Sequence, residues 1–379
     1  MMTLTVYVGC YTTADRKGRG EGITAYRMDE QSGEWTSLGL VARTANPSFL
    51  TRHPNLPVVY CVHGGNMSEV SAFAAEADGH PGHNLSQKFG PQDSPQRESP
   101  SAELLRPLGR WPSGGANPVH LDFHASGRWL VVANYTGATA AVLPVQPSGE
   151  LGEASDIVPM VGTPGPHPVE QSSSHPHHIP FDPSSNFIAI PDKGLDCVFV
   201  FRIDLQAGRL RAAQPASVAS APGAGPRHIA FHPSARWAYV INELNSTITS
   251  YAFEERGDGM RELQTVPSVP GDVEVRNTGS EVVVHPTGRW VYVSNRGHNS
   301  VGAFEVHDRT GMLAPIGWYP TQGDTPRAIA LDPDGRFLYA ANQSSDTIVT
   351  FRVDERNGTL APTGQVISTG SPSTMVFVR

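Results

Sequence analysis

The chain has 379 residues, of which 17% are charged and 39% hydrophobic, and its formal net charge is −8 at pH 7. This mild negative charge comes without any block of like charge, which argues against nucleic acid or an anionic membrane as a partner. Glycine (38) and proline (33) are abundant, no long segment carries apolar residues at helical spacing, and no stretch is long enough to span a bilayer. We therefore expect an all-β protein.

Three cysteines, Cys10, Cys61 and Cys197, lie far apart in the sequence. Their odd number and the lack of paired-ligand spacing predict buried, reduced thiols rather than disulfides or a metal site. The first residues, MMTLTVYVGC, contain no basic segment followed by an apolar region and a cleavage site. Together these features predict a cytoplasmic protein.

The chain begins with two β-prone segments, LTVYVGCYTT from residue 4 and GITAYRM from residue 22, around a Gly-rich basic loop at residues 12–22 that we expect to be solvated. A polar insertion follows at about residues 77–110, where no core strand is expected before Ala102–Leu108. Disorder and a functional lid are equal alternatives for this insertion. A second polar loop, residues 162–174, leads into a histidine-rich run, and we expect it to serve the site.

The stretch GPRHIAFHPSARWAYVINELNST at residues 225–247 predicts a β-hairpin. Residues 227–231 and 237–241 are β-prone, and the cluster HPSAR between them is typical of a turn. In an antiparallel hairpin the start of the first strand and the end of the second lie at the same end. Arg227 and Glu243 should therefore face each other at one end of the hairpin.

The same hairpin pattern occurs seven times, and a third strand follows it, as at residues 247–253, 300–306 and 347–353. A repeat of roughly 45 to 50 residues built from three or four short strands predicts one domain, residues 1–379, folded as a seven-bladed β-propeller. The last copy, SPSTMVFVR, supplies only an inner strand, and the start of the chain supplies the strands that it lacks. We expect residues near Thr5–Val8 to pair with residues near Met375–Val378, which closes the ring.

In each copy, two residues should point toward one end of the central channel, which we call the rim. One follows the residue that opens the first strand, a proline in most copies, and the other ends the second strand. The first set comprises Ser48, Val119, His177, Arg227, Glu281, Arg327 and Ser373. The second set comprises Tyr11, Gly64, Tyr135, Lys193, Glu243, Arg296 and Gln343. Charged residues concentrate in four consecutive copies, from His177 to Arg327, whereas a solvated rim would not segregate charge in this way.

Cationic residues outnumber acidic ones in these two sets, which predicts an anionic ligand, because planar guanidinium groups suit carboxylate or phosphate. The candidate substrate-binding residues are Lys193, Glu281, Arg327, Tyr135 and, from the second polar loop, Gln171. An alternative interpretation treats Arg227 with Glu243, and Glu281 with Arg296, as structural ion pairs.

His177 would complete an acid/base site, because an imidazole exchanges protons near neutral pH. Neighbouring arginines disfavour its charged form, so a neutral His177 can act as a base beside an ionised Glu243. The run His175-x-His177-His178 suggests a metal site, but strand alternation would send His177 and His178 to opposite faces, and no carboxylate or cysteine lies at ligand spacing. We therefore expect no metal.

The remaining histidines near these positions, His228, His232 and His285, are expected to be structural, with backbone groups as their partners. Nucleophilic catalysis has little support, because the chain has no G-x-S-x-G elbow and Ser174 beside His175 is a common pairing.

Three stretches, GPRHIAFHPSARWAYVINELNST, EVVVHPTGRWVYVSNRGHNSV and SHPHHIPFDPSSNF, resemble signature segments of the lactonase family of seven-bladed β-propellers. That family includes cycloisomerase-type 6-phosphogluconolactonases and the fungal carboxy-cis,cis-muconate cyclising enzymes. The similarity covers the whole chain except residues 77–110. It implies an active site without a cofactor, made of a His, a Glu and two Arg, here His177, Glu243, Arg227 and Arg296.

The sequence departs from the family pattern at His178, where bacterial members commonly have Ser, and in the length of the insertion. Both departures bear on the substrate more than on the reaction. The leading hypothesis is a metal-independent hydrolase of a sugar lactone, 6-phosphoglucono-1,5-lactone above all, in which His177 or Glu243 is the base. The alternatives are a cycloisomerase acting on an unsaturated dicarboxylate and a non-catalytic propeller that serves as an interaction platform.

Overall fold

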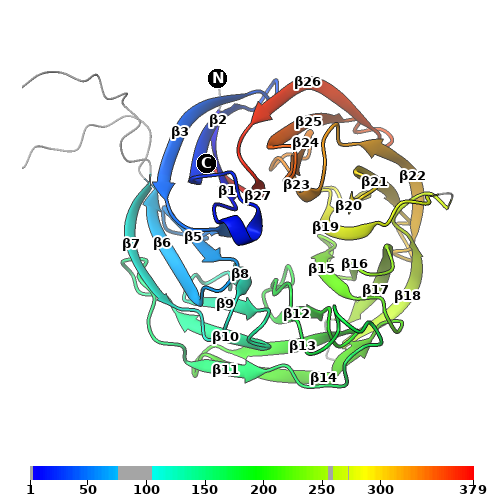
Figure 1. Ribbon diagram of the computed structural model, residues 1–379. Coiled ribbons are helices and arrows are strands. Elements are labelled where there is room, and N and C mark those ends of the chain that lie inside the picture. The colour runs from blue at the N-terminus through cyan, green and yellow to red at the C-terminus, as the bar shows by residue number, and fades with distance from the viewer. Residues whose placement is uncertain (1–2, 76–104, 255–258, 272) are drawn as a thin grey trace, which may run out of the picture.

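The computed structural model describes residues 3–75, 105–254, 259–271 and 273–379, which form seven antiparallel sheets arranged as a closed ring around a central channel (Figure 1). The expected all-β, seven-bladed propeller is confirmed. Among the described residues the one helical element is the short 3-10 helix η1, Ala14–Arg16. It lies over the channel near the inner end of blade 1 (Figure 1).

The blades follow one another around the ring, each with its innermost strand named first here. Blade 1 contains β27 (Pro372–Val378), β1 (Thr3–Cys10), β2 (Gly22–Asp29) and β3 (Trp35–Arg43). Blade 2 contains β4 (Pro47–Arg52), β5 (Val58–His63), β6 (Glu69–Ala75) and β7 (Leu105–Pro112). Blade 3 contains β8 (Pro118–Phe123), β9 (Trp129–Asn134), β10 (Thr139–Pro144) and β11 (Asp156–Pro159). Blade 4 contains β12 (Phe187–Asp192), β13 (Cys197–Asp204) and β14 (Arg209–Ala219).

The last three blades each have four strands. Blade 5 contains β15 (Pro226–Phe231), β16 (Trp237–Asn242), β17 (Thr247–Glu254) and β18 (Gly259–Pro267). Blade 6 contains β19 (Thr278–Val284), β20 (Trp290–Arg296), β21 (Ser300–Val306) and β22 (Leu313–Pro320). Blade 7 contains β23 (Pro326–Leu331), β24 (Phe337–Asn342), β25 (Thr347–Val353) and β26 (Leu360–Ser368).

The two ends of the chain meet in blade 1, as the sequence predicts. Strand β1 pairs with β27 in the register Thr5 to Val378 through Val8 to Met375. Apolar side chains of blades 7 and 1 pack into one buried cluster across this seam, with Trp35 against Tyr339 at a ring-centroid distance of 4.6 Å. Similar clusters fill the space between the other blades, so the core of the protein is a set of interblade layers rather than one central mass.

Blade 4 departs from the expected hairpin. Its innermost segment, residues 175–182, meets β12 only through isolated bridges, from Pro176 to Asp192 and from Phe181 to Ile188. The prolines at positions 176 and 180 lack the N–H groups that a regular ladder requires, which explains the irregular pairing. His177 and His178 therefore sit on an irregular segment and not on a strand.

The predicted insertion falls between β6 and β7 of blade 2 in the sequence and ends earlier than predicted. Strand β7 occupies residues 105–112, so the last part of the predicted insertion at 77–110 belongs to the outer strand of blade 2. Leu105, Leu108 and Trp111 supply the apolar side chains of this strand, and a register shift opposite Ala72 and Phe73 interrupts its regular alternation. Residues 77–104 of the predicted insertion lie outside the described residues.

Two of the three cysteines, Cys10 and Cys61, are buried, and all three are free thiols. The expectation of full burial is wrong for Cys197, which is half-buried on β13. Burial raises the pKa of the Cys61 and Cys197 thiols to about 12. Neither is a thiolate at neutral pH, which agrees with the predicted inert role.

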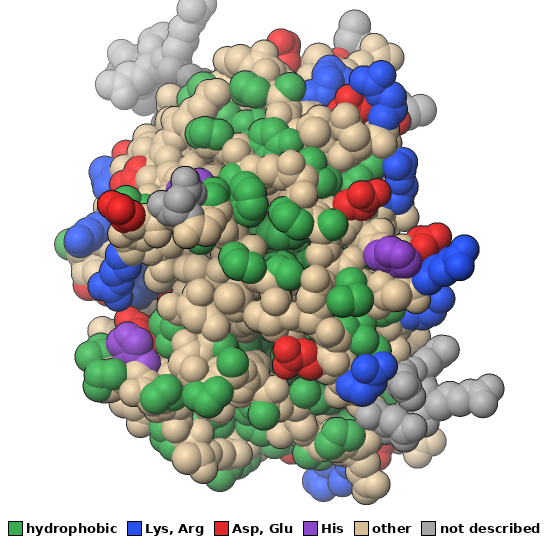
Figure 2. Space-filling model, turned by 90° about the vertical axis from the view of Figure 1, so that its right-hand side faces the viewer, with side chains coloured by type: hydrophobic (Ala, Val, Ile, Leu, Met, Phe, Trp, Pro, Cys, Tyr) green, Lys and Arg blue, Asp and Glu red, His purple; other side chains and the backbone are tan. Residues whose placement is uncertain are grey.

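The outer wall carries a mixed set of charges. Figure 2 shows Lys and Arg side chains close to Asp and Glu side chains, with apolar side chains scattered among them. No helix within the described residues is long and apolar enough to cross a membrane.

Three turn histidines tie neighbouring blades together. Each sits after an innermost strand, accepts a backbone N–H at Nδ1 and uses Nε2–H to reach the carbonyl of a turn glycine in the next blade. The three pairs are His53–Gly127 (2.8 Å), His232–Gly288 (3.0 Å) and His285–Gly335 (3.0 Å). The structural role predicted for His232 and His285 is confirmed.

We expect His285→Ala to lower the free energy of unfolding by about 1–3 kcal/mol, because the Gly335 carbonyl is left without its partner in a buried contact. Urea denaturation measures the change. The matched control is His307→Ala, since the His307 side chain is 59% exposed and makes no comparable contact between blades. Equal losses for the two variants would contradict the interblade role.

Candidate active site

An irregularity at the start of the innermost strands aims one set of side chains into the channel. In blade 5, Pro226 pairs with Asn242 and His228 with Ile241, so Arg227 is an extra residue without a partner on β16. In four other blades the same register shift leaves one residue without a partner on the neighbouring strand. These residues are Ser48, Val119, Arg327 and Ser373. In blade 6 it falls between Gly279 and Val282 and includes Glu281. A β-bulge redirects the side chain of the extra residue, here toward the channel.

The predicted residues line two spaces rather than one rim. All seven members of the first set line a narrow space of about 20 Å³ inside the channel, together with Tyr11, Phe49 and His228. Above it lies a cavity of about 180 Å³, which we call the rim cavity. It is lined by Arg16, Asn117, Val119, Tyr135, His177, Lys193, Glu243, Arg296 and Arg327. Of the two predicted sets, Gly64 and Gln343 line neither space.

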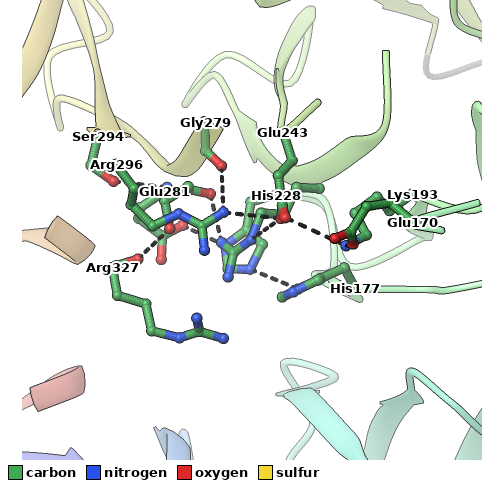
Figure 3. Close-up of polar contacts among 12 residues, drawn as sticks. Glu170, His177, Lys193, His228, Glu243, Gly279, Glu281, Ser294, Arg296 and Arg327 are labelled. Carbon is green, nitrogen blue, oxygen red and sulfur yellow. Dashed lines mark hydrogen bonds and ion pairs between the residues drawn. The ribbon is translucent and has the colours of Figure 1, made fainter. Parts of the chain in front are cut away.

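Glu243 is the centre of an ion-pair cluster in the rim cavity (Figure 3). Its Oε2 lies 3.0 Å from Nε of Arg227 and 3.1 Å from Nη2 of Arg296, and its Oε1 lies 3.4 Å from Nζ of Lys193. The Arg227 N–H is not aligned on that oxygen, so this contact is an ion pair without a hydrogen bond. Lys193 also binds Glu170 at 2.7 Å. Residues of blades 4, 5 and 6 thus share one carboxylate.

This cluster keeps Glu243 ionised. Burial by itself would raise the pKa of the carboxyl group, but Arg296, Lys193 and Arg227 together hold it well below its usual range. Burial and the adjacent Arg296 lower the pKa of Arg227 to about 9, which leaves it a cation at neutral pH. Glu243 is therefore a fixed negative charge and a poor proton acceptor.

Two further guanidinium groups face the rim cavity from the opposite side. Those of Arg327 and Arg16 lie 5.1 Å and 4.7 Å from the centroid of the Tyr11 ring, and Arg16 also donates to the Tyr11 hydroxyl at 3.0 Å. Within the described ranges, no carboxylate lies at ion-pair distance from either group. Figure 3 shows the Arg327 side chain extending into the channel away from the Glu243 cluster. Their charges are available for an anion.

His177 stands between these two groups of cations. It is 7% exposed and lines both the rim cavity and the narrow space below. Burial lowers its pKa well below the ordinary value, and Arg227, His228 and Lys193 lower it further. The imidazole is therefore neutral at pH 7, as the sequence suggests, and can accept a proton.

His228 has a different role from the one predicted. We expected backbone partners, but its ring nitrogens contact two side chains: Nε2 lies 3.2 Å from Nδ1 of His177, and Nδ1 lies 2.6 Å from Oε1 of Glu281. Its ring also stacks on His178, with centroids 4.2 Å apart. These partners come from blades 4 and 6, on either side of blade 5, so no local sequence pattern indicates them.

The expectation that no carboxylate lies near the histidine run is wrong. His178, His228 and Glu281 offer ligand atoms within 4.8 Å of one another, so a carboxylate from another copy does approach the histidine run. Two ligands on one tetrahedral ion lie roughly 3.3 Å apart. The 2.6 Å between His228 and Glu281 is instead a hydrogen-bond distance. The two atoms are therefore partners in a hydrogen bond.

The other predicted substrate-binding residues differ in their access to the rim cavity. Tyr135 lines it, with its ring stacked on His175 at 4.3 Å and Lys193 Nζ 5.2 Å from the ring centroid. Glu281 lies deeper, in the narrow space. Gln171 lines neither space, because its amide group holds the polar loop against the Lys193 carbonyl at 2.9 Å.

Three residues of this region are absent from the sequence predictions: Arg16, Asn117 and Glu170. Arg16 belongs to the basic loop that we expected to be merely solvated, and its proximity to Tyr11 was the available signal. Glu170 belongs to the polar loop that leads to His175, which we did expect to serve the site. Ser174 donates to Asp192 at 2.5 Å, so it is not a partner of His175 in a nucleophilic pair.

Comparison with known proteins decides the family. Residues 5–377 match the family described as lactonase, 7-bladed beta-propeller. The chain belongs to the lactonase family of seven-bladed β-propellers. It is 32% identical over 321 residues to the 6-phosphogluconolactonase of Bacillus subtilis (strain 168), covering 85% of this chain and 83% of that protein. It is 30% identical over 332 residues to the 6-phosphogluconolactonase of Formosa agariphila, covering 86% of each.

A solved structure agrees with this assignment. The periplasmic gluconolactonase of Pseudomonas aeruginosa superimposes with a TM-score of 0.84 at 30% identity, covering 100% of this chain and 99% of that one. The family match and these relatives identify the protein as a lactonase, an enzyme that hydrolyses lactones. The resemblance stated from the sequence is confirmed.

Acid should destabilise this lactonase through its buried histidines. Burial holds the pKa values of His120, His177, His178 and His228 well below the ordinary value. Below about pH 6.5 the unfolded chain binds protons at these positions that the folded chain does not bind, so stability falls as pH falls. Each such proton contributes up to about 1.4 kcal/mol per pH unit.

We therefore expect the free energy of unfolding, measured in urea, to drop steeply between pH 7 and pH 5. His120→Gln removes one of the four imidazoles and should reduce the slope by up to about 1.4 kcal/mol per pH unit. An unchanged slope in this variant would show that His120 is not held neutral.

Proposed function

We propose that this protein hydrolyses a phosphorylated sugar lactone, 6-phosphoglucono-1,5-lactone, to the open-chain acid. The observation that carries this proposal is the pairing of a neutral histidine with two guanidinium groups that have no carboxylate partner. His177, Arg327 and Arg16 all line the same cavity of about 180 Å³. The names of the Bacillus and Formosa relatives support the same substrate.

Arg327 and Arg16 are suited to bind the phosphate group. Guanidinium groups form paired, charge-assisted hydrogen bonds with phosphate oxygens, and two of them near one aromatic ring offer several donors in one place. Five cations, Arg16, Arg227, Arg296, Arg327 and Lys193, surround the two spaces, against the carboxylates of Glu170, Glu243 and Glu281. The excess of positive charge favours a dianionic ligand.

His177 is the general base in this proposal. Of the two candidates, Glu243 is held ionised by three cations, which makes it too weak a base to take a proton from water. Burial and the same cations also lower the pKa of His177, but this leaves the imidazole neutral, with a lone pair that can accept a proton. Glu243 instead holds Arg227, Arg296 and Lys193 in fixed positions around the reacting carbonyl.

The chemical steps follow from these roles. Water attacks the lactone carbonyl carbon while His177 takes one of its protons. Arg296, at the edge of the cavity, stabilises the resulting oxyanion. The bond between the carbonyl carbon and the ring oxygen then breaks, and His177 returns the proton to that oxygen. The product is a hydroxy acid, which ionises at neutral pH.

The chain's own residues supply both the base and the cations, so the mechanism needs no metal or cofactor. The only partner that it requires is the small anionic lactone. We also infer a cytoplasmic location, which three free thiols and the phosphorylated substrate support. The Pseudomonas neighbour is named as periplasmic, so cell fractionation with an antibody against this chain is the test.

A direct turnover assay tests the reaction. We expect opening of 6-phosphoglucono-1,5-lactone faster than its spontaneous hydrolysis, unchanged by a chelator. His177→Asn should lower kcat by roughly 10²- to 10⁴-fold with KM within a few fold, because the base is lost while the anion-binding groups remain. The control is His53→Asn, a buried histidine bonded to Gly127 far from the cavity.

The opposite outcomes separate the alternatives. Wild-type kcat in His177→Asn would remove histidine from the base role. Activity lost in chelator and restored by one divalent ion would contradict a metal-independent site. No turnover of any aldonolactone would favour a cyclising enzyme or an interaction platform.

The phosphate subsite has its own test. We expect Arg327→Ala to raise KM for the phosphorylated lactone by roughly 10- to 100-fold, the cost of a lost charge-assisted contact. KM for glucono-1,5-lactone, which has no phosphate, should change little. Arg52→Ala, an exposed arginine at the far end of β4, serves as the control. Equal effects on both lactones would contradict a phosphate role for Arg327.

A further inference from the structure

A chain of hydrogen bonds leads from the rim cavity into the interior through three blades. His177 of blade 4 contacts His228 of β15, Nδ1 to Nε2, at 3.2 Å, and His228 contacts Glu281 of β19, Nδ1 to Oε1, at 2.6 Å (Figure 3). The three side chains belong to residues that are 7%, 3% and 8% exposed. Because Nδ1 of His177 is taken by His228, Nε2 is the nitrogen left for a ligand.

The direction of this chain depends on Glu281. An ionised carboxylate can only accept, so His228 would carry its proton on Nδ1 and accept at Nε2 from His177. A protonated carboxyl group would reverse both bonds and place the His177 proton on Nε2. The two cases differ in whether His177 presents a lone pair or a proton to the cavity.

Two observations favour the ionised form of Glu281. Its Oε1 already accepts the backbone N–H of Val282 at 3.2 Å. In the opposite sense, burial raises the pKa of this carboxyl group, and His178, Arg227 and Arg327 only reduce that rise. The histidine that it contacts is neutral and lies close enough for a short, charge-assisted hydrogen bond at 2.6 Å.

We propose that His228 and Glu281 are positioning residues that keep the proton of His177 on Nδ1 and leave Nε2 free as the base. Each neutral imidazole has one donor and one acceptor, so the carboxylate at the inner end fixes both tautomers in turn. The arrangement resembles the carboxylate that orients a catalytic histidine, with a second imidazole inserted between them. Its catalytic consequence rests on the proposed function, whereas the tautomer does not.

Glu281 also offsets the surrounding positive charge. The charged or titratable groups that act on His177 are Arg227, His228, Lys193 and Arg327, and those that act on Glu281 are His178, Arg227 and Arg327. When His177 takes a proton from water, the nearby cations oppose the new charge. The negative charge at the far end of the chain reduces that penalty.

The experiment is nitrogen NMR on protein labelled with ¹⁵N-histidine at pH 8. The signals of His177 are those lost in His177→Asn. We expect His177 Nδ1 to carry the proton and Nε2 to have the shift of an unprotonated nitrogen. A proton on Nε2 of His177 would overturn the proposal, whatever the activity of the protein.

Kinetics provide the second readout. Glu281→Gln keeps an oxygen that can accept from His228 but removes the charge, so kcat should fall roughly 10-fold or more with KM little changed. The acid limb of the kcat/KM profile should move to lower pH, because loss of a negative charge disfavours the imidazolium. The matched control is Asp332→Asn, a buried carboxylate bonded to the Phe337 N–H outside the site, which should move neither quantity.

The outcomes distinguish this proposal from the proposed function. Turnover of the lactone with the proton on Nε2 would contradict the positioning role and leave the function standing. The expected tautomer without lactone turnover would contradict the function alone. A Glu281→Gln variant that loses stability but keeps its acid limb would reduce Glu281 to a structural residue.

Discussion

The structure depends on a geometric constraint at the inner edge of every blade. A closed ring forces seven innermost strands to converge, and a β-bulge or irregular pairing at the start of each one leaves a single residue pointing into the channel. The chain enters five of these strands through a residue in the left-handed region that precedes the proline: Asn46, Asn117, Gly225, Thr325 and Ser371. Residues hundreds of positions apart therefore meet in a space of about 20 Å³.

Charge balance then determines the chemistry of the rim cavity. One carboxylate, Glu243, holds three cations within 3.4 Å, which fixes their geometry and removes Glu243 as a proton acceptor. The remaining cations, Arg327 and Arg16, stay available for an anion. Burial of the site, together with Arg227, Lys193 and Arg327, keeps His177 neutral. In the proposed function, the same electrostatic arrangement provides both anion binding and a base at neutral pH.

The sequence predicts the fold and much of the site because both follow from a repeat. The seven hairpins locate the blades, and ring closure locates the residues that face the channel. The sequence alone could not show which residues face the narrow space and which face the rim cavity, because a one-residue bulge leaves no pattern in the sequence. It also misassigned His228, because its partners His177 and Glu281 come from other blades. Arg16 escaped notice because a loop that folds back over the channel looks like any solvated basic loop.

The most direct test of the central claim is a crystal structure of the protein with 6-phosphogluconate, the product of the proposed reaction. The account predicts phosphate oxygens within about 3.2 Å of Arg327 and Arg16, and the carboxylate beside Nε2 of His177. The channel also has a cavity of about 570 Å³ at its other end, lined by Pro286, Pro333 and Phe377. Product bound there, or with its phosphate held by Lys193, would contradict the account.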